Sequence, residues 1–341
     1  MPTPPKRILT AHDAVAERLK KPPMALHFRG KTPAEWRQWR RSFRRALVAE
    51  LGPMPERVPL RAEVIAEDDL GDVIRRKVIF DSERYASVPA YLVVPKGLEA
   101  GERRPGILCA HGHGVGKDAL AGITGEEYEH HIALRLAREG YVTLSPDWRT
   151  FGERADPEAW VRRPGRDGCN VAYLAQGYFG YQLLGLQIHD AQVCLDYLQS
   201  LPQVAGSRLG MIGCSFGGTM TSYVSALDDR IKVSIPVCYL STVKSALTVQ
   251  HGNTCGSQFA FGLLKHGEIS DVFGLLAPRP CMPQVGRQDT CFLLDDALKA
   301  AKHLKTIYKA AGAANSLAVH VFPGVHEIDV EPAVEFFKAH L

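Results

Sequence analysis

No apolar run in this 341-residue sequence approaches the roughly 18 residues that a membrane-spanning helix requires. The first segment, Met1 to Arg7, carries three prolines and two basic side chains and lacks the apolar stretch of a secretory signal peptide. We therefore expect a cytoplasmic protein that has no membrane partner.

Paired cysteines are also missing. No two of the eight cysteines form the Cys-x-x-Cys pattern that is typical of zinc ribbons and thiol redox motifs. Several lie within apparent strands or helices, where cysteine behaves as a small apolar side chain. We therefore expect free thiols in a reducing compartment, and neither a metal nor another cofactor. The cysteines are Cys109, Cys169, Cys194, Cys214, Cys238, Cys255, Cys281 and Cys291.

Charge of one sign is not in large excess. The formal net charge is +4, which is too small to indicate binding to nucleic acid. With 45% hydrophobic and 23% charged residues, the composition is typical of a soluble globular protein. One basic cluster lies on an expected amphipathic helix, where a solvated face is the favoured interpretation and an anionic partner is the alternative. It consists of Arg37, Arg40, Arg41, Arg44 and Arg45.

An N-terminal extension is predicted over residues 1–70. Its first part, 1–30, is rich in proline and is expected to be irregular. The stretch from Thr32 to Glu35 then forms a capping box with proline at the first helical position, so an amphipathic helix is expected over about 33–51. This helix should pack one face against the body of the protein. The extension could also form an interface between two copies of the protein, so a homo-oligomer is one of the possible states.

Residues 71–341 are predicted to form one larger α/β domain. Strands near 73–81 and 88–95 give an antiparallel start, and alternating strands and helices then predict a mostly parallel sheet with helices on both faces. Inserts at about 148–181 and 239–278 follow strand ends, where such sheets bind ligands, so they are candidate pocket walls. The later strands are expected at 106–111, 141–146, 208–213, 231–237, 281–286 and 317–322, and the helices near 129–138, 182–200, 216–227, 293–311 and 330–340.

The stretch Gly213-Cys214-Ser215-Phe216-Gly217 fits the Gly-x-Ser-x-Gly pattern of a nucleophile elbow. By chance this pattern should occur in roughly one chain of this length in ten, so its context decides its meaning. An expected strand ends before it, and an expected helix begins after it. Such a tight turn strains the serine backbone and exposes its hydroxyl, which makes Ser215 a candidate nucleophile.

A serine nucleophile requires a base and an orienting acid, which in this kind of sheet follow the serine in the order Asp or Glu and then His. Asp289 follows the strand expected at 281–286, and His326 follows the strand expected at 317–322. Both residues should therefore lie at the same edge of the sheet as the serine. We expect Ser215, Asp289 and His326 to form a catalytic triad.

Neighbouring residues offer alternatives to these assignments. Asp295 and Asp296 lie at the start of an expected helix, where acidic side chains are favoured without any catalytic role. His320 lies within an expected strand, which favours a packed or surface position. Cys214 occupies the variable position before the serine, so we expect its side chain to point into the fold.

An oxyanion hole needs backbone N–H groups near the developing negative charge. We assign one to Phe216, the residue after the serine, and the other to His113 in the glycine-rich loop from His111 to Gly116. The alternative is that His111 and His113 bind a metal. A His-x-His pair without a third ligand at useful spacing is a weak zinc signal.

The inserts also supply candidate pocket residues. Arg149 lies in a charged stretch after an expected strand, and a structural ion pair that braces the oxyanion loop is favoured over substrate contact. For each aromatic candidate, packing within the insert is at least as good an interpretation. The candidates are His111, Arg149, Tyr178, Phe179 and Phe259, with Tyr181, Phe261 and the stretch from His251 to Cys255 as further members.

Together these motifs make the chain resemble the α/β-hydrolase superfamily, in particular its acetyl xylan esterase-like and dienelactone hydrolase-like groups, over roughly residues 32–341. The resemblance implies an α/β-hydrolase fold. It also implies a serine esterase that cleaves a small-molecule carboxylic ester, such as an acetyl ester, through an acyl-enzyme and without a cofactor. The motifs are His111-Gly112-His113-Gly114, Asp147-x-Arg149-x-x-Gly152, the elbow, Ala277-Pro278-Arg279-Pro280 and His326-Glu327.

Two departures from these groups concern the substrate. Dienelactone hydrolases carry cysteine where this chain has Ser215, and carbohydrate acetyl esterases usually carry Arg-Gly-Gln-Gly where it has Arg149-Thr150-Phe151-Gly152. We still expect hydrolase chemistry, but the sequence does not indicate a sugar acetate as the substrate. Two other functions stay as alternatives, an amidase or peptidase of the prolyl-oligopeptidase type and a catalytically silent binding protein on the same fold.

Overall fold

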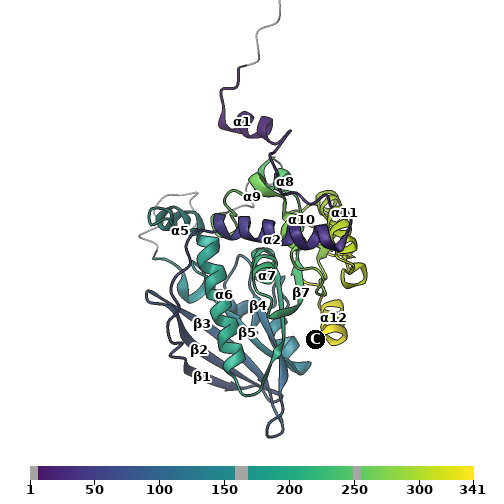
Figure 1. Cartoon of the computed structure of the whole chain (residues 1–341). Coiled ribbons are helices and arrows are strands. Elements are labelled where there is room, and N and C mark those ends of the chain that lie inside the picture. The colour runs from purple at the N-terminus through teal and green to yellow at the C-terminus, as the bar shows by residue number, and fades with distance from the viewer. Residues whose placement is uncertain (1–6, 158–167, 249–254) are drawn as a thin grey trace, which may run out of the picture.

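A mixed sheet of nine strands forms the centre of the protein, whose computed structural model describes residues 7–157, 168–248 and 255–341 (Figure 1). The strands lie side by side in the order β1-β2-β3-β5-β4-β6-β7-β8-β9. The pairs from β1 to β5 are antiparallel, and all pairs from β5 to β9 are parallel. The bounds are β1 Glu63–Asp69, β2 Val73–Glu83, β3 Ala86–Pro95, β4 Arg104–Ala110, β5 Val142–Pro146, β6 Val204–Cys214, β7 Ile231–Val237, β8 Gln284–Gly286 and β9 His320–Phe322.

Strand β4 marks the point where the chain reverses its direction across the sheet. The chain passes from β4 to its neighbour β5, returns to β6 on the other side of β4, and then continues outward through β7, β8 and β9. Sheets of this kind bind ligands at the carboxyl ends of the strands next to such a reversal. The glycine-rich loop follows β4 and the serine turn follows β6, so the topology brings them together.

Helices cover both faces of the sheet. Helices α2, α6, α7, α10 and α11 pack on one face, and α4 and α12 pack on the other. This arrangement confirms the α/β-hydrolase fold, with antiparallel first strands and N-terminal helices. None of the described helices is long and apolar enough to cross a membrane. The bounds are α1 Ala11–Arg18, α2 Pro33–Glu50, α3 Lys117–Leu120, α4 Ile132–Arg138, α5 Gly168–Gly177, α6 Leu183–Ser200, α7 Phe216–Leu227, α8 Val243–Thr248, α9 Leu263–His266, α10 Ile269–Gly274, α11 Leu294–Ala310 and α12 Val330–His340.

The parallel strands are buried on both faces, which explains their continuous apolar runs. In β4, Leu108 and Ala110 face the core that contains α2, α6 and α7. Ile107 and Cys109 alternate with them and face the core that contains α4 and α12. All four side chains are buried, so this strand contributes to both cores. The glycine-rich loop follows directly after it.

Helix α2 begins at the expected capping box. Thr32 Oγ1 accepts the N–H of Glu35 at 3.3 Å, and Glu35 Oε2 accepts the N–H of Thr32 at 2.9 Å. Trp36 and Trp39 are both buried on the inner face of the helix. The capping box and the apolar spacing therefore gave the start and the packed face of this helix correctly.

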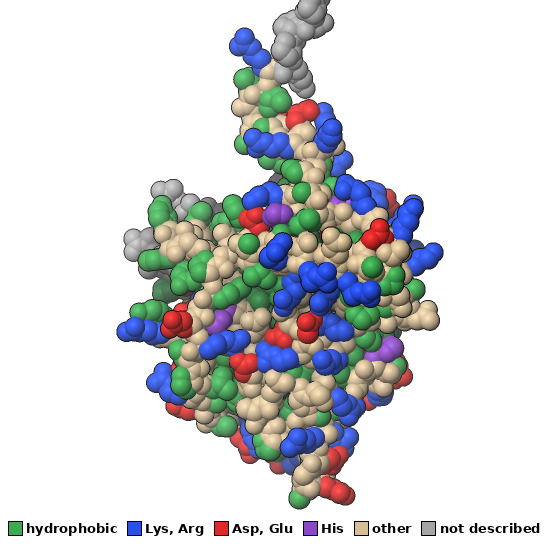
Figure 2. Space-filling model, viewed as in Figure 1, with side chains coloured by type: hydrophobic (Ala, Val, Ile, Leu, Met, Phe, Trp, Pro, Cys, Tyr) green, Lys and Arg blue, Asp and Glu red, His purple; other side chains and the backbone are tan. Residues whose placement is uncertain are grey.

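The arginine cluster lies along the outer face of α2, where Lys and Arg side chains gather across the molecule (Figure 2). Arg40 and Arg44 reach the protein body and donate hydrogen bonds to the backbone carbonyls of Leu275 and Leu227. The other three arginines are exposed. Part of the cluster thus holds α2 against the body, and the rest forms a solvated face.

The segment before α2 is attached to the second insert. The N–H groups of residues 24–26 donate to the carbonyls of residues 264–266, and the N–H of Phe28 donates to Asp271 Oδ1 at 3.0 Å. Helix α1, which has no buried residue, projects from the body (Figure 1). The prediction of irregular structure over 1–30 is wrong for this helix, whose N-cap Thr10 accepts the N–H of Asp13.

Strand β1 was not expected from the sequence, and strands β8 and β9 are shorter than expected. The seven residues of β1 are all exposed, so no buried face marked this strand in the sequence. Strands β8 and β9 have three residues each, because Cys281 and Leu317 join the sheet only by isolated bridges. Pro283 interrupts the longer strand expected at 281–286, since proline has no N–H to donate to the ladder.

Candidate active site

Ser215 lies at the sharp turn from β6 to α7, with φ 60° and ψ −117°. A positive φ is rare outside glycine and indicates a strained residue that its surroundings hold in place. The flanking glycines permit this turn. A Cβ on Gly213 would lie 2.4 Å from the Ala110 carbonyl oxygen, and one on Gly217 would lie 2.0 Å from it. The motif therefore lets the turn approach β4 and presents Ser215 at the carboxyl edge of the sheet.

Asp289 and His326 are in contact at the same edge of the sheet. His326 Nδ1 lies 2.9 Å from Asp289 Oδ2. The other carboxylate oxygen accepts the N–H groups of Cys291 at 2.6 Å and Phe292 at 3.0 Å. The carboxylate is thus almost fully buried, with both oxygens hydrogen-bonded. The loops after β8 and β9 bring together the acid and the base that the sequence suggested.

Burial and pairing shift the pKa of both residues. Burial alone would raise the pKa of Asp289, but the hydrogen bond and charge of His326, with the two backbone N–H groups, lower it overall. Burial opposes the charged form of His326 as well, yet contacts with Asp289 and Cys238 raise the pKa of this histidine. In this arrangement the Nδ1 proton points at the carboxylate, which leaves Nε2 for a substrate or nucleophile.

Ser215 is connected to this pair through a shared neighbour. Its N–H donates to the carbonyl of Val237 at 3.0 Å, and the sulfur of the next residue, Cys238, lies within 4.8 Å of a ring nitrogen of His326. Within the described parts of the chain, Ser215 Oγ forms no hydrogen bond. Catalytic hydrogen bonds are often long without a ligand and tighten only when substrate binds.

The loop after β4 runs in contact with the serine turn. A Cβ on Gly112 would lie 2.8 Å from the Cys214 carbonyl oxygen and 3.2 Å from the Cβ of Ser215. The N–H groups of Phe216 and His113 donate to no described residue. Two free N–H groups beside a serine, one of them at the start of α7, can stabilise a negatively charged oxygen.

Tyr128 and Glu129 hold this loop, and the sequence reasoning missed both. The Tyr128 hydroxyl donates to the His113 carbonyl at 3.0 Å, and its ring centroid lies 5.7 Å from that of His326. Glu129 Oε1 accepts the N–H of Gly112 at 2.7 Å, and burial raises the pKa of Glu129 to about 8. They precede α4 in a stretch without a motif, so no pattern marked them.

Cys238 is a third residue that the sequence reasoning did not single out. It directly follows β7 with a φ of 48°. Hydrogen bonds with Cys214 and, to a smaller extent, His326 lower the pKa of its thiol to about 7 against the effect of burial. Its position just past a strand next to the serine strand was the available signal. Cys214 itself is fully buried.

His111 supports the loop, Arg149 forms ion pairs in the protein body, and neither lines the cavity described below. His111 is fully buried, its Nε2 accepts the N–H of Trp148 at 3.0 Å, and Nδ1 lies 2.7 Å from the Gly112 carbonyl oxygen. Burial lowers the pKa of His111 to about 4, so its ring is neutral near pH 7. Arg149 Nε pairs with the buried Asp190 at 2.8 Å. Both side chains are held by protein partners. The ion pair expected for Arg149 is present, but it joins Arg149 to Asp190 and Glu83 and not to the loop after β4.

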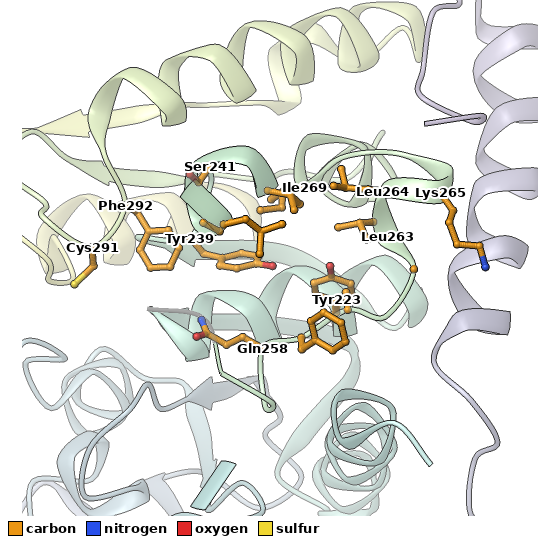
Figure 3. Close-up of a pocket in the computed structure, with 16 residues that line it drawn as sticks. Tyr223, Tyr239, Ser241, Gln258, Leu263, Leu264, Lys265, Ile269, Cys291 and Phe292 are labelled. Atoms are coloured by element: carbon orange, nitrogen blue, oxygen red, sulfur yellow. The ribbon is translucent and has the colours of Figure 1, made fainter. Parts of the chain in front are cut away.

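An apolar cavity of about 240 Å³ lies under the second insert (Figure 3). Cys291 and Phe292 line one end of it, and the ring of Phe292 stacks on that of His326 with centroids 5.9 Å apart. Tyr223 and Tyr239 lie near its middle, where Figure 3 shows both rings beside the open space. The cavity thus begins next to the Asp289–His326 pair and is walled mainly by hydrocarbon and aromatic side chains.

The aromatic pocket candidates lie in different places. Phe259 lines the cavity, whereas Tyr178 and Phe179 are 93% and 77% exposed and lie away from it. Phe261 is also exposed, and Tyr181 is partly buried. Residues 251–254 lie outside the described parts of the chain, so their suggested role stays a prediction.

Three groups of described side chains could hold a metal ion, and none of them includes His111. The alternative in which His111 and His113 bind one metal together therefore has no support among these groups. Each group contains a hydrogen bond between two of its side chains. The distances are 2.7 Å for His27 with Asp271, 2.9 Å for Asp289 with His326, and 3.0 Å for His113 with Cys255. The groups are His27, Asp271 and His303; Cys238, Asp289 and His326; and His113, Cys169 and Cys255.

The sequence profile of the Abhydrolase family matches residues 4–325. The chain belongs to this family. The protein named "Putative hydrolase YtaP" from Bacillus subtilis (strain 168) is 31% identical to this abhydrolase over 285 residues. The match spans 81% of this chain and 90% of that protein.

Solved structures with the same fold include esterases. A "putative acetyl xylan esterase" from Bacteroides fragilis NCTC 9343 matches this abhydrolase with a TM-score of 0.77 at 19% identity, over 94% of this chain and 84% of that one. The glucuronoyl esterase from Solibacter usitatus matches with a TM-score of 0.69 at 17% identity, over 94% and 97% of the two chains. Identities this low establish the shared fold, and the substrates in these names belong to those proteins.

Proposed function

We propose that this abhydrolase hydrolyses carboxylic esters through an acyl-enzyme, with Ser215, His326 and Asp289 as its catalytic triad. The observation that carries the proposal is the hydrogen bond between His326 and Asp289 beside the strained serine turn. A histidine oriented by a buried carboxylate is what the activation of a serine hydroxyl requires. The family match and the esterase structures with this fold support the same chemistry.

In the proposed acylation, His326 Nε2 takes the proton of Ser215 as Oγ attacks the ester carbonyl carbon. Asp289 holds the imidazole through Nδ1 and stabilises the imidazolium that forms. The free N–H groups of Phe216 and His113 bind the oxygen that becomes negative. His326 then gives the proton to the leaving alcohol, and a water activated by the same histidine releases the acid.

The cavity beside His326 supports a substrate with a small hydrocarbon group. Its walls are mainly apolar, and its volume of about 240 Å³ suits a short acyl chain or an aromatic ring better than a sugar, which needs many polar partners. We therefore propose an acetyl or related small-acyl ester of a small molecule. No metal or cofactor takes part in the proposed steps.

The test is the hydrolysis of p-nitrophenyl acetate by the wild type and by Ser215→Ala. We expect kcat to fall by a factor of roughly 10⁴ or more, because the nucleophile is removed while oxyanion binding remains. The matched control is Cys214→Ala, which changes the adjacent buried side chain and should keep most of the wild-type rate. Wild-type turnover by Ser215→Ala would overturn the proposal.

The same enzyme preparation separates ester from amide cleavage. An amidase or peptidase of the prolyl-oligopeptidase type would use the same three residues, so Ser215→Ala does not distinguish it. We expect kcat/KM for p-nitrophenyl acetate to exceed that for aminoacyl p-nitroanilides. The reverse order would favour the amidase, and the absence of turnover for both would favour a binding protein.

A further inference from the structure

Three side chains from separate parts of the chain meet beside the loop after β4. His113 Nε2 lies 3.0 Å from Cys255 Sγ and 3.9 Å from Cys169 Sγ, and the three atoms all lie within 4.8 Å of one another. The histidine comes from that loop, Cys169 from the first turn of α5, and Cys255 from the second insert. Both cysteines are buried, and neither is in a disulfide.

The two nitrogen–sulfur separations, 3.0 Å and 3.9 Å, lie on either side of the separation found in a tetrahedral metal site, so small side-chain shifts would place the three atoms around one ion. With Zn–S bonds of about 2.3 Å and Zn–N bonds of about 2.0 Å, tetrahedral geometry places nitrogen and sulfur about 3.5 Å apart and two sulfurs about 3.8 Å apart. Thiolate and imidazole are the ligands that zinc prefers. Three protein ligands leave one position for water or another small ligand, and the exposed His113 makes that side reachable from solvent.

The backbone is built so that the two cysteines can approach. Gly256 lies against α5, where a Cβ would be 2.5 Å from the Cys169 carbonyl oxygen and 2.4 Å from the Cβ of Tyr173. Only glycine permits this contact. The N–H of Gly256 also donates to Asn170 Oδ1 at 2.8 Å. Asn170 follows Cys169 and Gly256 follows Cys255, so this hydrogen bond holds the two cysteine segments together. The sulfurs are therefore brought together by the packing of the two inserts.

Polar groups also surround the sulfur atoms. Thr150 Oγ1 lies 3.5 Å from Cys169 Sγ, and the N–H of Gln258 donates to the backbone carbonyl of Cys255 at 3.1 Å, which fixes the chain beside the second sulfur. A disulfide would not need a histidine nitrogen within 3.0 Å and 3.9 Å of the two sulfurs. The surroundings are those of a metal site.

We propose that His113 Nε2, Cys169 Sγ and Cys255 Sγ bind one zinc ion. The ion would join the loop after β4 to both inserts and hold the three segments at fixed distances. The proposal rests on these contacts and not on the proposed esterase activity, because none of the three side chains takes or gives a proton in the proposed reaction.

The first test is the zinc content of the full-length protein. The reduced protein is incubated with zinc chloride, desalted, and analysed by inductively coupled plasma mass spectrometry. We expect about one zinc per chain in the wild type, and at least roughly tenfold weaker retention in Cys169→Ser and Cys255→Ser. The matched control is Cys194→Ala, which removes a buried thiol of α6 and should retain the zinc. Circular dichroism shows whether each variant is folded.

The second test does not depend on the folding of a variant. When cobalt(II) replaces zinc in the wild type, a tetrahedral site with two thiolates should give intense visible ligand-field bands and a near-ultraviolet sulfur-to-cobalt charge-transfer band. Three results would each overturn the proposal: a wild type that retains no zinc, an octahedral cobalt spectrum, or a Cys169–Cys255 disulfide in protein purified without oxygen. Equal zinc content in folded Cys255→Ser would also overturn it.

Discussion

His326 has two neighbours that favour its charged form, the Asp289 carboxylate and the Cys238 thiol. Burial acts in the opposite direction, but together the two contacts raise the pKa of His326. A general base must be neutral, so kcat/KM should rise as the pH rises through this pKa. The acid limb of the pH profile should therefore lie above about 6.5, the usual value for histidine.

Replacing Cys238 by alanine should move that acid limb to lower pH. The substitution removes one of the two groups that raise the pKa of His326 and leaves Asp289 in place. The measurement is kcat/KM for p-nitrophenyl acetate between about pH 5 and 10. Cys194→Ala serves as the control and should keep the wild-type limb. If the acid limb of the kcat/KM profile lies at the same pH in Cys238→Ala as in the wild type, the thiol does not raise the pKa of His326.

Glu129 makes the stability of the protein depend on pH. Burial raises the pKa of Glu129 from 4.5 to about 8, so the folded state holds this proton more tightly than the unfolded state. The stability that the proton contributes is fully present below about pH 4.5 and is lost as the pH rises through about 8. Glu129→Gln cannot ionise and keeps an oxygen for the N–H of Gly112.

The prediction is a growing advantage of Glu129→Gln at high pH. The free energy of unfolding is measured in urea at about pH 5 and at about pH 9. The value for the variant minus the value for the wild type should be larger at the higher pH. The gain should be at most a few kcal/mol, since one pKa unit corresponds to about 1.4 kcal/mol. If the free energies of unfolding of the variant and the wild type differ by the same amount at both pH values, Glu129 is ionised over this whole pH range and the prediction is wrong.

Single residues were predictable where a local pattern marks them. Ser215 is flanked by glycines that its strained turn requires, and Asp289 and His326 each follow a strand at the expected edge. The supporting residues carry no such mark, because Tyr128 and Glu129 act only through contacts with a loop distant in sequence. Arg149 was correctly assigned to an ion pair from the density of charge around it.

Among the elements, the second insert determines the shape of the cavity. Ala260 lines the cavity between α8 and α9, and a larger side chain there would fill part of its volume. Ala260→Trp should lower kcat/KM for p-nitrophenyl octanoate by about tenfold relative to the acetate, which is roughly 1.4 kcal/mol of lost binding. The acetate rate in the same variant is the control. An unchanged ratio of the two rates would place the acyl chain elsewhere.

Elements were predictable from sequence where burial gives a regular pattern. Helix α2 begins at its capping box, and the parallel strands were found because both faces are apolar. Strand β1 has only exposed residues, so its place at the sheet edge comes from pairing with β2 alone. Helix α1 also has no fully buried residue, and the prolines before it favoured an irregular segment over a helix with Thr10 as its cap.

For the whole molecule, the order of strands and helices predicted a mostly parallel sheet with helices on both faces. The alternating pattern restricts the topology, and the resemblance to a known superfamily reduced it to one. The pairing of the two inserts was not predictable, because it depends on Gly256 and on contacts between segments more than 80 residues apart, such as Gly256 with Asn170. For the same reason the cluster of His113, Cys169 and Cys255 could not be read from cysteine spacing.

The central claim is that Ser215 is the activated nucleophile of the folded protein. The most direct measurement is labelling of the full-length wild type with a fluorophosphonate probe, followed by mass spectrometry of the peptides. We predict one adduct per chain, on Ser215, which is lost in Ser215→Ala and retained in Cys214→Ala. An unlabelled folded wild type, or an adduct on another residue, would contradict the account.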